Sequence, residues 1–322
     1  MRMLLSLFAG IGLVLATTLA QATTWNMATP YPDTTFHTQN IRQFAADIDK
    51  ATHGKLKIIV HSGGSLIKHP QIKRAVQTMQ VQAGEVFISI LGNENPIYTV
   101  DSIPFLATSY PEARKLWDAS RPYIEARLKK DGLMLLYSVP WPPQGLYTSR
   151  DVKTVADLKG LKFRAYNQAT AKFAQLAGMV PTQVEVPDIP QAFATGIVDA
   201  MITSPSTGAN TKAWDFVKRF YDIQAWIPKN MVIINRRAFE SLSAEEQKAV
   251  LNAAAAAETR GWNMSEKEAS EKKKILAAHG IKVIQPSPAL ESGLKAIGKT
   301  ITDEWLKAAG PDGAAIIKAY RQ

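Results

Sequence analysis

The sequence predicts an α/β fold of two similar lobes with a cleft between them, and three observations support this. The chain has 322 residues, more than one hydrophobic core usually organises. Strand-like and helix-like segments alternate along it, which is typical of largely parallel sheets covered by helices. The rigid turn Pro140-Trp141-Pro142-Pro143 interrupts this alternation, which then restarts, so we expect a hinge at that boundary.

In the first half, the β-α-β opening is the clearest pattern. Apolar residues recur at helical spacing from Phe36 to Ala51, and Gly54 ends that helix. Ser109-Tyr110-Pro111-Glu112 is a capping box with proline in the first turn, which predicts a helix start. The expected strands are 25–28, 56–61, 86–91, 133–139 and 146–149, and the expected helices are 36–51, 71–82 and 110–128.

The second half repeats the alternation and then becomes helical. We expect strands at 161–166 and 198–203 and helices at 169–177 and 189–195.

The capping box Ser243-Ala244-Glu245-Glu246 opens a proline-free stretch to His279, interrupted only by Gly261. About 36 helical residues would span about 54 Å, more than one lobe. The alternative is two helices broken near Gly261, since a helical glycine costs about 1 kcal/mol. Apolar spacing from Leu290 to Trp305 predicts a C-terminal amphipathic helix.

Composition places the chain among folded proteins and excludes several chemistries. Apolar residues make up 46% and charged residues 20%, unlike disordered or coiled-coil chains. No cysteine occurs, which excludes disulfides, thiol nucleophiles and zinc-thiolate sites. The net charge of +10 comes from basic residues interleaved with acidic ones, as in Glu266-Lys267-Glu268. This pattern favours solvated helix faces, so we expect no nucleic-acid partner.

The N-terminus has the pattern of a secretory signal peptide. Arg2 supplies a positive charge, residues 4–19 are largely apolar, and Ala20-Gln21-Ala22 forms an A-x-A cleavage site. The alternative is a retained membrane anchor, which needs about 20 apolar residues, whereas this segment ends in Gln and Thr. We therefore predict export, with cleavage after Ala22.

Residues 293–300 match a nucleotide-binding P-loop pattern, with Lys299 as its lysine. A functional P-loop needs an open turn directly after a strand. Because Leu290, Leu294 and Ile297 recur at helical spacing through the motif, we interpret it as a chance match and expect no ATP binding. Three S-x-x-K matches lack their companion motifs, and the five histidines lack metal-ligand spacing. We predict no catalytic residue, cofactor or metal.

Arg164 is the stronger candidate for a binding residue. The predicted strand places Phe163 and Ala165 on one face and Arg164 and Tyr166 on the other. An arginine at a strand end, beside aromatic and amide groups such as Asn167, can hold a carboxylate through two hydrogen bonds. This segment alone is equally compatible with the alternative that Arg164 forms a structural ion pair with a nearby Asp.

The chain resembles the extracytoplasmic solute-binding proteins of TRAP (tripartite ATP-independent periplasmic) transporters. The signal peptide and the runs at 101–106 (DSIPFL), 157–164 (DLKGLKFR) and 196–200 (GIVDA) carry the resemblance, which covers essentially the whole mature chain. It implies a periplasmic location, and a two-lobed periplasmic binding protein fold with mixed sheets flanked by helices. It also implies a long helix across both lobes, a salt bridge from Arg164 to a ligand carboxylate, and TRAP membrane permease subunits as partners.

The resemblance also suggests a division of the chain. We expect a signal peptide at 1–22, mainly lobe 1 at 23–145 and mainly lobe 2 at 146–240, with some strand exchange between the lobes. Residues 241–322 would form the lobe-spanning helix and the C-terminal helix.

One departure from the family pattern narrows the expected class of ligand. Its sugar-acid and sialic-acid binders carry a second arginine where this chain has Gln144 near Trp141. One cation with added aromatic surface suits a monocarboxylate, such as a 2-oxo or 2-hydroxy acid with an apolar or aromatic tail. The predicted ligand-binding residues are Arg164, Gln144, Trp141, Tyr166, Asn167, Thr203, Ser204, His37, Ser89 and Asn93.

The leading hypothesis is a solute-binding protein that delivers an organic acid to a permease and is not an enzyme. One alternative is a secreted enzyme acting on a small organic acid in the same cleft. Another is a binding protein for a C4-dicarboxylate or a sugar acid. An ATP-cassette-type binding protein would keep the function and change only the membrane partner.

Overall fold

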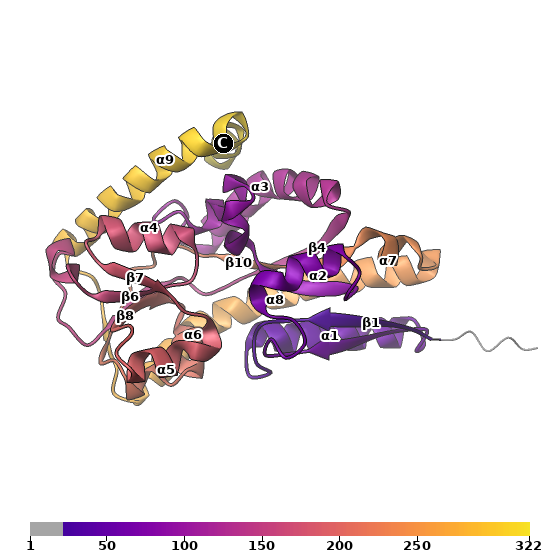
Figure 1. Cartoon of the computed structure of the whole chain (residues 1–322), viewed down its shortest axis with the longest axis horizontal. Coiled ribbons are helices and arrows are strands. Elements are labelled where there is room, and N and C mark those ends of the chain that lie inside the picture. The colour runs from indigo at the N-terminus through magenta and orange to yellow at the C-terminus, as the bar shows by residue number, and fades with distance from the viewer. Residues whose placement is uncertain (1–21) are drawn as a thin grey trace, which may run out of the picture.

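The computed structural model describes residues 22–322, so the signal-peptide prediction, apart from Ala22, lies outside the described residues. Residues 22–322 form two β-sheets flanked by helices, arranged as two lobes (Figure 1). The first sheet has the strand order β2-β1-β3-β10-β4, and the second has the order β11-β9-β5-β8-β6-β7. The predicted class of mixed sheets flanked by helices is therefore confirmed.

The first sheet begins with the predicted β-α-β unit, in which β1 and β2 pair in parallel. β3 adds to β1 in parallel, and β10 runs antiparallel between β3 and β4. Its strands are β1 (Thr23–Ala28), β2 (Leu56–His61), β3 (Ala83–Phe87), β4 (Leu133–Pro140) and β10 (Lys229–Asn235), and its helices are α1 (Phe36–Ala51), α2 (Ile72–Gln77) and α3 (Tyr110–Lys130).

In the second sheet β6 lies in parallel between β7 and β8, and β5 runs antiparallel to β8 and β9. β11 extends the edge in parallel with β9. The strands are β5 (Gly145–Thr148), β6 (Lys162–Ala165), β7 (Val180–Gln183), β8 (Ala200–Thr203), β9 (Arg219–Tyr221) and β11 (Lys282–Ile284). The short helices of this lobe are α4 (Gln168–Leu176), α5 (Ile189–Ala194) and α6 (Pro205–Asn210).

The chain crosses between the sheets more than once. Residues 141–144 lead from β4 to β5, and residues 222–228 lead back from β9 to β10. β10 thus belongs to the first sheet, although its neighbours in sequence, β9 and β11, belong to the second. The positions of the domain boundaries stay a prediction.

A single long helix, α8 (Ala244–Ala278), spans both lobes after the short α7 (Arg236–Glu240). It packs on α1 and β4 at one end and on α6 and β11 at the other, which Figure 1 shows in orange. Its 35 residues are continuous, so the alternative of two helices is wrong. Gly261 lies in its middle because a Cβ there would be 2.4 Å from a Val139 methyl, and glycine lets the helix approach β4 closely.

The last helix, α9 (Pro288–Arg321), contacts α3 in one lobe and α4 in the other. The predicted apolar face is buried from Leu290 to Trp305. Gly310 has φ 60° and ψ −142°, which kinks the helix just before Pro311.

Two predicted elements differ from the structure. The helix expected at 71–82 covers only Ile72–Gln77, since Met79 adopts a left-handed φ of 63°. The strand expected at 86–91 ends at Phe87, because β10 pairs no further than Phe87, and a 3-10 helix follows at Ile88–Asn93.

Candidate functional site

A pocket lies between the lobes, where strand ends from both sheets meet. It has about 420 Å³ of space not occupied by protein atoms, including the part that is open to solvent. The β6, β7 and β8 carboxyl ends face it from one side, and those of β1, β3 and β4 face it from the other, a usual place for ligands in α/β proteins. The lining residues are Tyr31, His69, Phe87, Trp141, Gln144, Arg164, Tyr166, Glu185, Val186, Thr203, Ser204, Thr207 and Pro228.

The first lobe supplies a largely aromatic wall. Tyr31 follows β1, Phe87 ends β3, and Trp141 follows β4 directly. The rings of Tyr31 and Trp141 meet edge to face, with centroids 5.1 Å apart and an interplanar angle of 69°. Both residues are buried, at 4% and 5% exposed, so this wall offers a largely apolar surface.

The second lobe supplies a buried cation. Arg164, in β6, is 2% exposed, and its Nε donates to the Val184 carbonyl at 2.8 Å. Its guanidinium carbon lies 4.8 Å from the centroid of the Tyr166 ring. Burial lowers the pKa of Arg164, opposed by Tyr166 and Glu185, and a guanidinium stays ionised in proteins.

No carboxylate lies within 4.0 Å of the Arg164 guanidinium nitrogens in residues 22–322. The structural Asp pair considered as an alternative therefore has no counterpart in that part of the chain. Isolated buried charges are costly, so an unpaired buried guanidinium at a pocket indicates an anionic ligand.

Glu185, just after β7, is the one acidic residue lining this pocket in the described chain. His69 of the first lobe approaches it, with Nδ1 and Oε2 3.4 Å apart. The other His69 nitrogen, Nε2, accepts from the Phe87 N–H at 3.2 Å, so the Nδ1 of a neutral ring carries the proton. Burial raises the pKa of Glu185, but the hydrogen bonds from His69 and Gln183 and the positive charge of Arg164 outweigh this, and the net effect is a lowered pKa.

Most of the remaining polar lining residues already have partners in the protein. The Gln144 amide donates to the Pro142 carbonyl at 2.8 Å. The Tyr166 hydroxyl accepts from Trp226 Nε1 at 3.0 Å, and burial raises the Tyr166 pKa. Ser204 caps α6 by accepting from the Thr207 N–H at 3.0 Å.

Six of the ten predicted ligand-binding residues line the pocket. These are Trp141, Gln144, Arg164, Tyr166, Thr203 and Ser204. These residues lie close together because the β4–β5 crossing and the ends of β6 and β8 all meet at the pocket. Whether they contact the ligand stays a prediction.

The other four, His37, Ser89, Asn93 and Asn167, do not line the pocket, and whether they contact a ligand stays a prediction. His37 is buried behind Trp141, with ring centroids 4.3 Å apart, and its Nδ1 lies 3.4 Å from Glu85. Asn93 is exposed at the end of a 3-10 helix. Asn167 caps α4 and donates to Ser89 Oγ at 2.6 Å, so these two side chains join the lobes beside the pocket.

Sequence reasoning missed seven lining residues: Tyr31, His69, Phe87, Glu185, Val186, Thr207 and Pro228. Glu185 and Val186 follow β7, and Pro228 directly precedes β10. Because neither strand was predicted, no sequence pattern pointed to these residues. Tyr31 follows β1, in a segment for which no functional residue was predicted.

The P-loop pattern at 293–300 lies inside α9, as expected, and Lys299 forms an i,i+4 ion pair with Asp303 at 2.6 Å. Across residues 22–322 no helix is long and apolar enough to cross a membrane. The same residues contain no group of three or more His, Asp or Glu placed to hold a metal ion.

Two lobes joined by crossing strands and long helices, with an interlobe pocket around a buried arginine, define a two-lobed ligand-binding protein. The chain belongs to the bacterial extracellular solute-binding proteins of family 7 (DctP), whose family model matches residues 27–308. The resemblance to TRAP solute-binding proteins is therefore confirmed. Proteins of this family work in transport and bind small organic acids outside the cytoplasm.

Three solved structures are similar over most of the chain. DctP7 of Bordetella pertussis is 50% identical, covers 94% of this chain and 100% of its own, and has a TM-score of 0.92. DctP6 of the same organism is 47% identical, covering 93% and 99%, also with a TM-score of 0.92. A TRAP solute-binding protein from a marine metagenome is 42% identical, covering 94% and 99%, with a TM-score of 0.91. All three are described as binding pyroglutamate or pyroglutamic acid.

Proposed function

We propose that this protein captures pyroglutamate, or a closely related small cyclic carboxylate, and delivers it to a TRAP permease without changing it chemically. The observation that carries the proposal is the buried Arg164 guanidinium, which faces the pocket with no protein carboxylate within 4.0 Å in residues 22–322. The three similar structures described as pyroglutamate complexes support the same ligand class.

Arg164 is oriented to bind a carboxylate end-on. Its Nε is engaged by the Val184 carbonyl, which fixes the side chain and leaves the two terminal nitrogens for the ligand. Two parallel hydrogen bonds from such a fork to a carboxylate are stronger and more directional than a single contact to an ammonium.

Glu185 adds a requirement that the sequence-based hypothesis of a 2-oxo or 2-hydroxy acid did not include. An ionised carboxylate only accepts hydrogen bonds, so the ligand group beside Glu185 has to donate one. Pyroglutamate has one carboxylate, one ring N–H and a compact apolar ring, which match Arg164, Glu185 and the Tyr31–Trp141 wall. The second carboxylate of a C4-dicarboxylate would meet Glu185, and a sugar acid would bury hydroxyls against aromatic rings.

A calorimetric titration panel tests the ligand. We expect pyroglutamate to bind more tightly than L-proline, a branched 2-oxo acid, succinate or glucuronate. Pyroglutamate at 100 times its Kd should add about 2.7 kcal/mol of stability in a parallel thermal melt. Tighter binding of succinate or glucuronate would contradict the proposal. Recovery of chemically altered pyroglutamate after incubation would favour the enzyme alternative instead.

We also propose export to the periplasm with cleavage after Ala22. The first strand, β1, begins at Thr23, and the Thr23 N–H donates to the Lys55 carbonyl at 2.7 Å. Cleavage at this position would leave the strand complete. Mass spectrometry of the protein from a periplasmic fraction should give a mature chain that begins at Thr23, and a retained Met1–Ala22 segment would contradict the proposal.

A further inference from the structure

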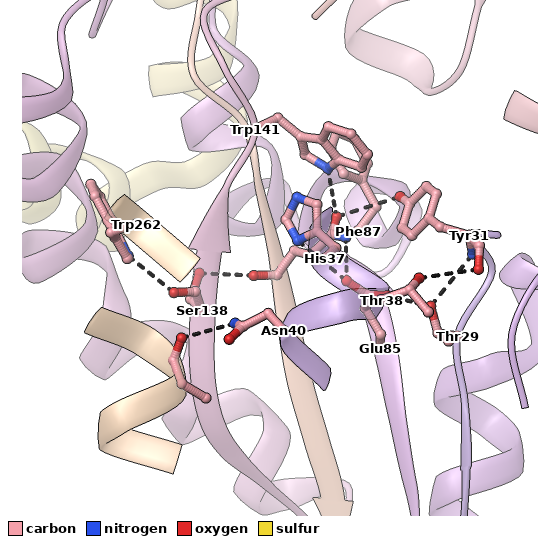
Figure 2. Close-up of polar contacts among 12 residues, drawn as sticks. Thr29, Tyr31, His37, Thr38, Asn40, Glu85, Phe87, Ser138, Trp141 and Trp262 are labelled. Atoms are coloured by element: carbon pink, nitrogen blue, oxygen red, sulfur yellow. Dashed lines mark hydrogen bonds and ion pairs between the residues drawn. The ribbon is translucent and has the colours of Figure 1, made fainter. Parts of the chain in front are cut away.

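A cluster of buried polar side chains lies behind the aromatic wall of the pocket. Glu85 of β3 and Asn230 of β10 form its centre, and both side chains are almost completely buried. Thr29 and His37 complete the cluster, and Figure 2 shows Glu85 beside Thr29 and His37, close to Tyr31 and Trp141. Neither Glu85 nor Asn230 lines the ligand pocket, so the proposed function gives this cluster no role.

Asn230 connects the cluster to the wall. Its Oδ1 accepts from Trp141 Nε1 at 2.9 Å and from the Tyr31 hydroxyl at 3.4 Å. An indole nitrogen can only donate, so the amide of Asn230 has to present its oxygen to Trp141. Its Nδ2 then points the other way and donates to Glu85 Oε1 at 2.6 Å.

Glu85 holds that amide in one orientation. It also accepts a short hydrogen bond from the Thr29 hydroxyl, and His37 Nδ1 lies 3.4 Å from its Oε1. Burial raises the pKa of Glu85 to about 7, while the hydrogen bonds from Thr29 and Asn230 lower it. Because the Asn230 amide and the Thr29 hydroxyl both donate to the Glu85 carboxylate, flipping the Asn230 amide would place its oxygen against a carboxylate oxygen.

We propose that Asn230 and Glu85 are positioning residues that hold the rings of Trp141 and Tyr31 in the orientation that forms the ligand wall. A buried polar network of this kind is costly compared with apolar packing, and its directionality selects one arrangement of the two rings. Side chains that bind a ligand have to be placed within about half an ångström. A flipped Asn230 amide should therefore displace both rings and weaken ligand binding. The choice of pyroglutamate as probe rests on the proposed function.

The first test reverses the direction of the hydrogen bond. Asn230→Asp places a second carboxylate against Glu85. Because the pKa of Glu85 is about 7 and two adjacent carboxyl groups can share a proton, the titration is done well above pH 7. There we expect the Kd for pyroglutamate to rise roughly tenfold or more, at 1.4 kcal/mol per decade. The double variant N230D/E85Q should recover most of that loss, because the new amide at position 85 can donate to the new carboxylate at position 230. That carboxylate still accepts from Trp141 and Tyr31, and the double variant keeps the wild-type net charge.

Asn235→Asp is the matched control. Asn235 lies on the same strand, is 4% exposed, and donates to the Val76 carbonyl at 2.9 Å, away from the pocket. We expect this variant to lose stability without losing affinity. Wild-type affinity in N230D, or no recovery in the double variant, would overturn the proposal.

A second measurement needs no ligand. The indole N–H resonance of Trp141, assigned with Trp141→Phe, should shift and exchange faster with solvent in Asn230→Leu, and should stay in place in the Asn235→Asp control. An unchanged Trp141 resonance in Asn230→Leu would overturn the proposal. If the wild type does not bind pyroglutamate, the proposed function fails, and this spectrum still decides whether Asn230 positions Trp141.

Discussion

Arg164 is the residue whose environment departs most from that of an ordinary surface cation. The residue is 2% exposed, and its Nε donates to the Val184 carbonyl at 2.8 Å. Burial lowers its pKa, so within residues 22–322 its charge is only partly compensated. A carboxylate in the pocket would supply the missing partner, and this makes the residue the direct test of the binding mode.

We expect Arg164→Ala to weaken pyroglutamate binding by about 2–5 kcal/mol, because it strands the ligand carboxylate in a closed pocket. That is roughly 30-fold to several thousand-fold in Kd, measured by calorimetry. Arg164→Lys should recover only part, since an ammonium cannot reproduce the two-point fork. The melting temperature without ligand should not fall. A variant that binds normally would show that Arg164 is structural.

Glu185 should determine which ring atom the ligand presents. The wild type should prefer pyroglutamate to the matching lactone, in which a ring oxygen replaces the N–H and would repel the Glu185 carboxylate. Glu185→Gln can donate as well as accept, so we expect this preference to shrink by roughly tenfold or more, since hydrogen bonds to charged groups contribute about 1.5–3 kcal/mol. Competitive titrations of both ligands measure it. An unchanged preference would place the ring N–H elsewhere.

Among the elements, α8 shows how one glycine fixes the packing between the lobes. A Cβ on Gly261 would lie 2.4 Å from a Val139 methyl and 2.8 Å from the Asn40 amide nitrogen. Gly261→Ala should therefore destabilise the protein by about 1–3 kcal/mol, although alanine is the better helix former. Ser270→Ala, at an exposed position of α8, is the control and should change stability by less than about 0.5 kcal/mol. Chemical denaturation gives both values, and a stabilised Gly261→Ala would contradict the close contact.

The elements also show what local patterns in the sequence can predict. The capping boxes at Ser109 and Ser243 begin α3 and α8 as expected, because capping depends on residues three apart. The strands β7, β9 and β11 have only three or four residues, too few for a period to appear, and their pairing joins distant parts of the chain. The position of Arg164 on a strand could be predicted, because the alternation of residues in that strand is visible in the local sequence. The place of His37 could not, since its partner Glu85 is 48 positions away in sequence.

At the scale of the whole molecule, several contacts close the pocket. The Ser89 hydroxyl of the first lobe accepts from Asn167 of the second at 2.6 Å, and His69 approaches Glu185 at 3.4 Å. The long helices α8 and α9 each pack on both lobes, so they hold the lobes together independently of these side chains. The state described here is therefore one in which the lobes touch across the pocket.

Ser89→Ala separates closure from ligand contact. Ser89 was expected to touch the ligand, but it lies outside the pocket lining and hydrogen-bonds across the lobes. Losing one such bond should weaken binding by about 0.5–1.5 kcal/mol, or roughly two- to tenfold, mostly through faster release, because the lobes part more easily. The loss should be similar for every ligand that binds, since the bond joins protein to protein.

The control is Ser120→Ala, a buried serine that donates within α3 to the Leu116 carbonyl at 2.8 Å. It removes the same hydroxyl without touching the cleft, so stopped-flow release rates should match the wild type. If Ser89→Ala lost affinity to different extents for pyroglutamate and for its lactone, Ser89 would instead contact the ligand directly. In that case the lobes would have to pack differently around the bound molecule, with the Asn167 contact given up to the ligand.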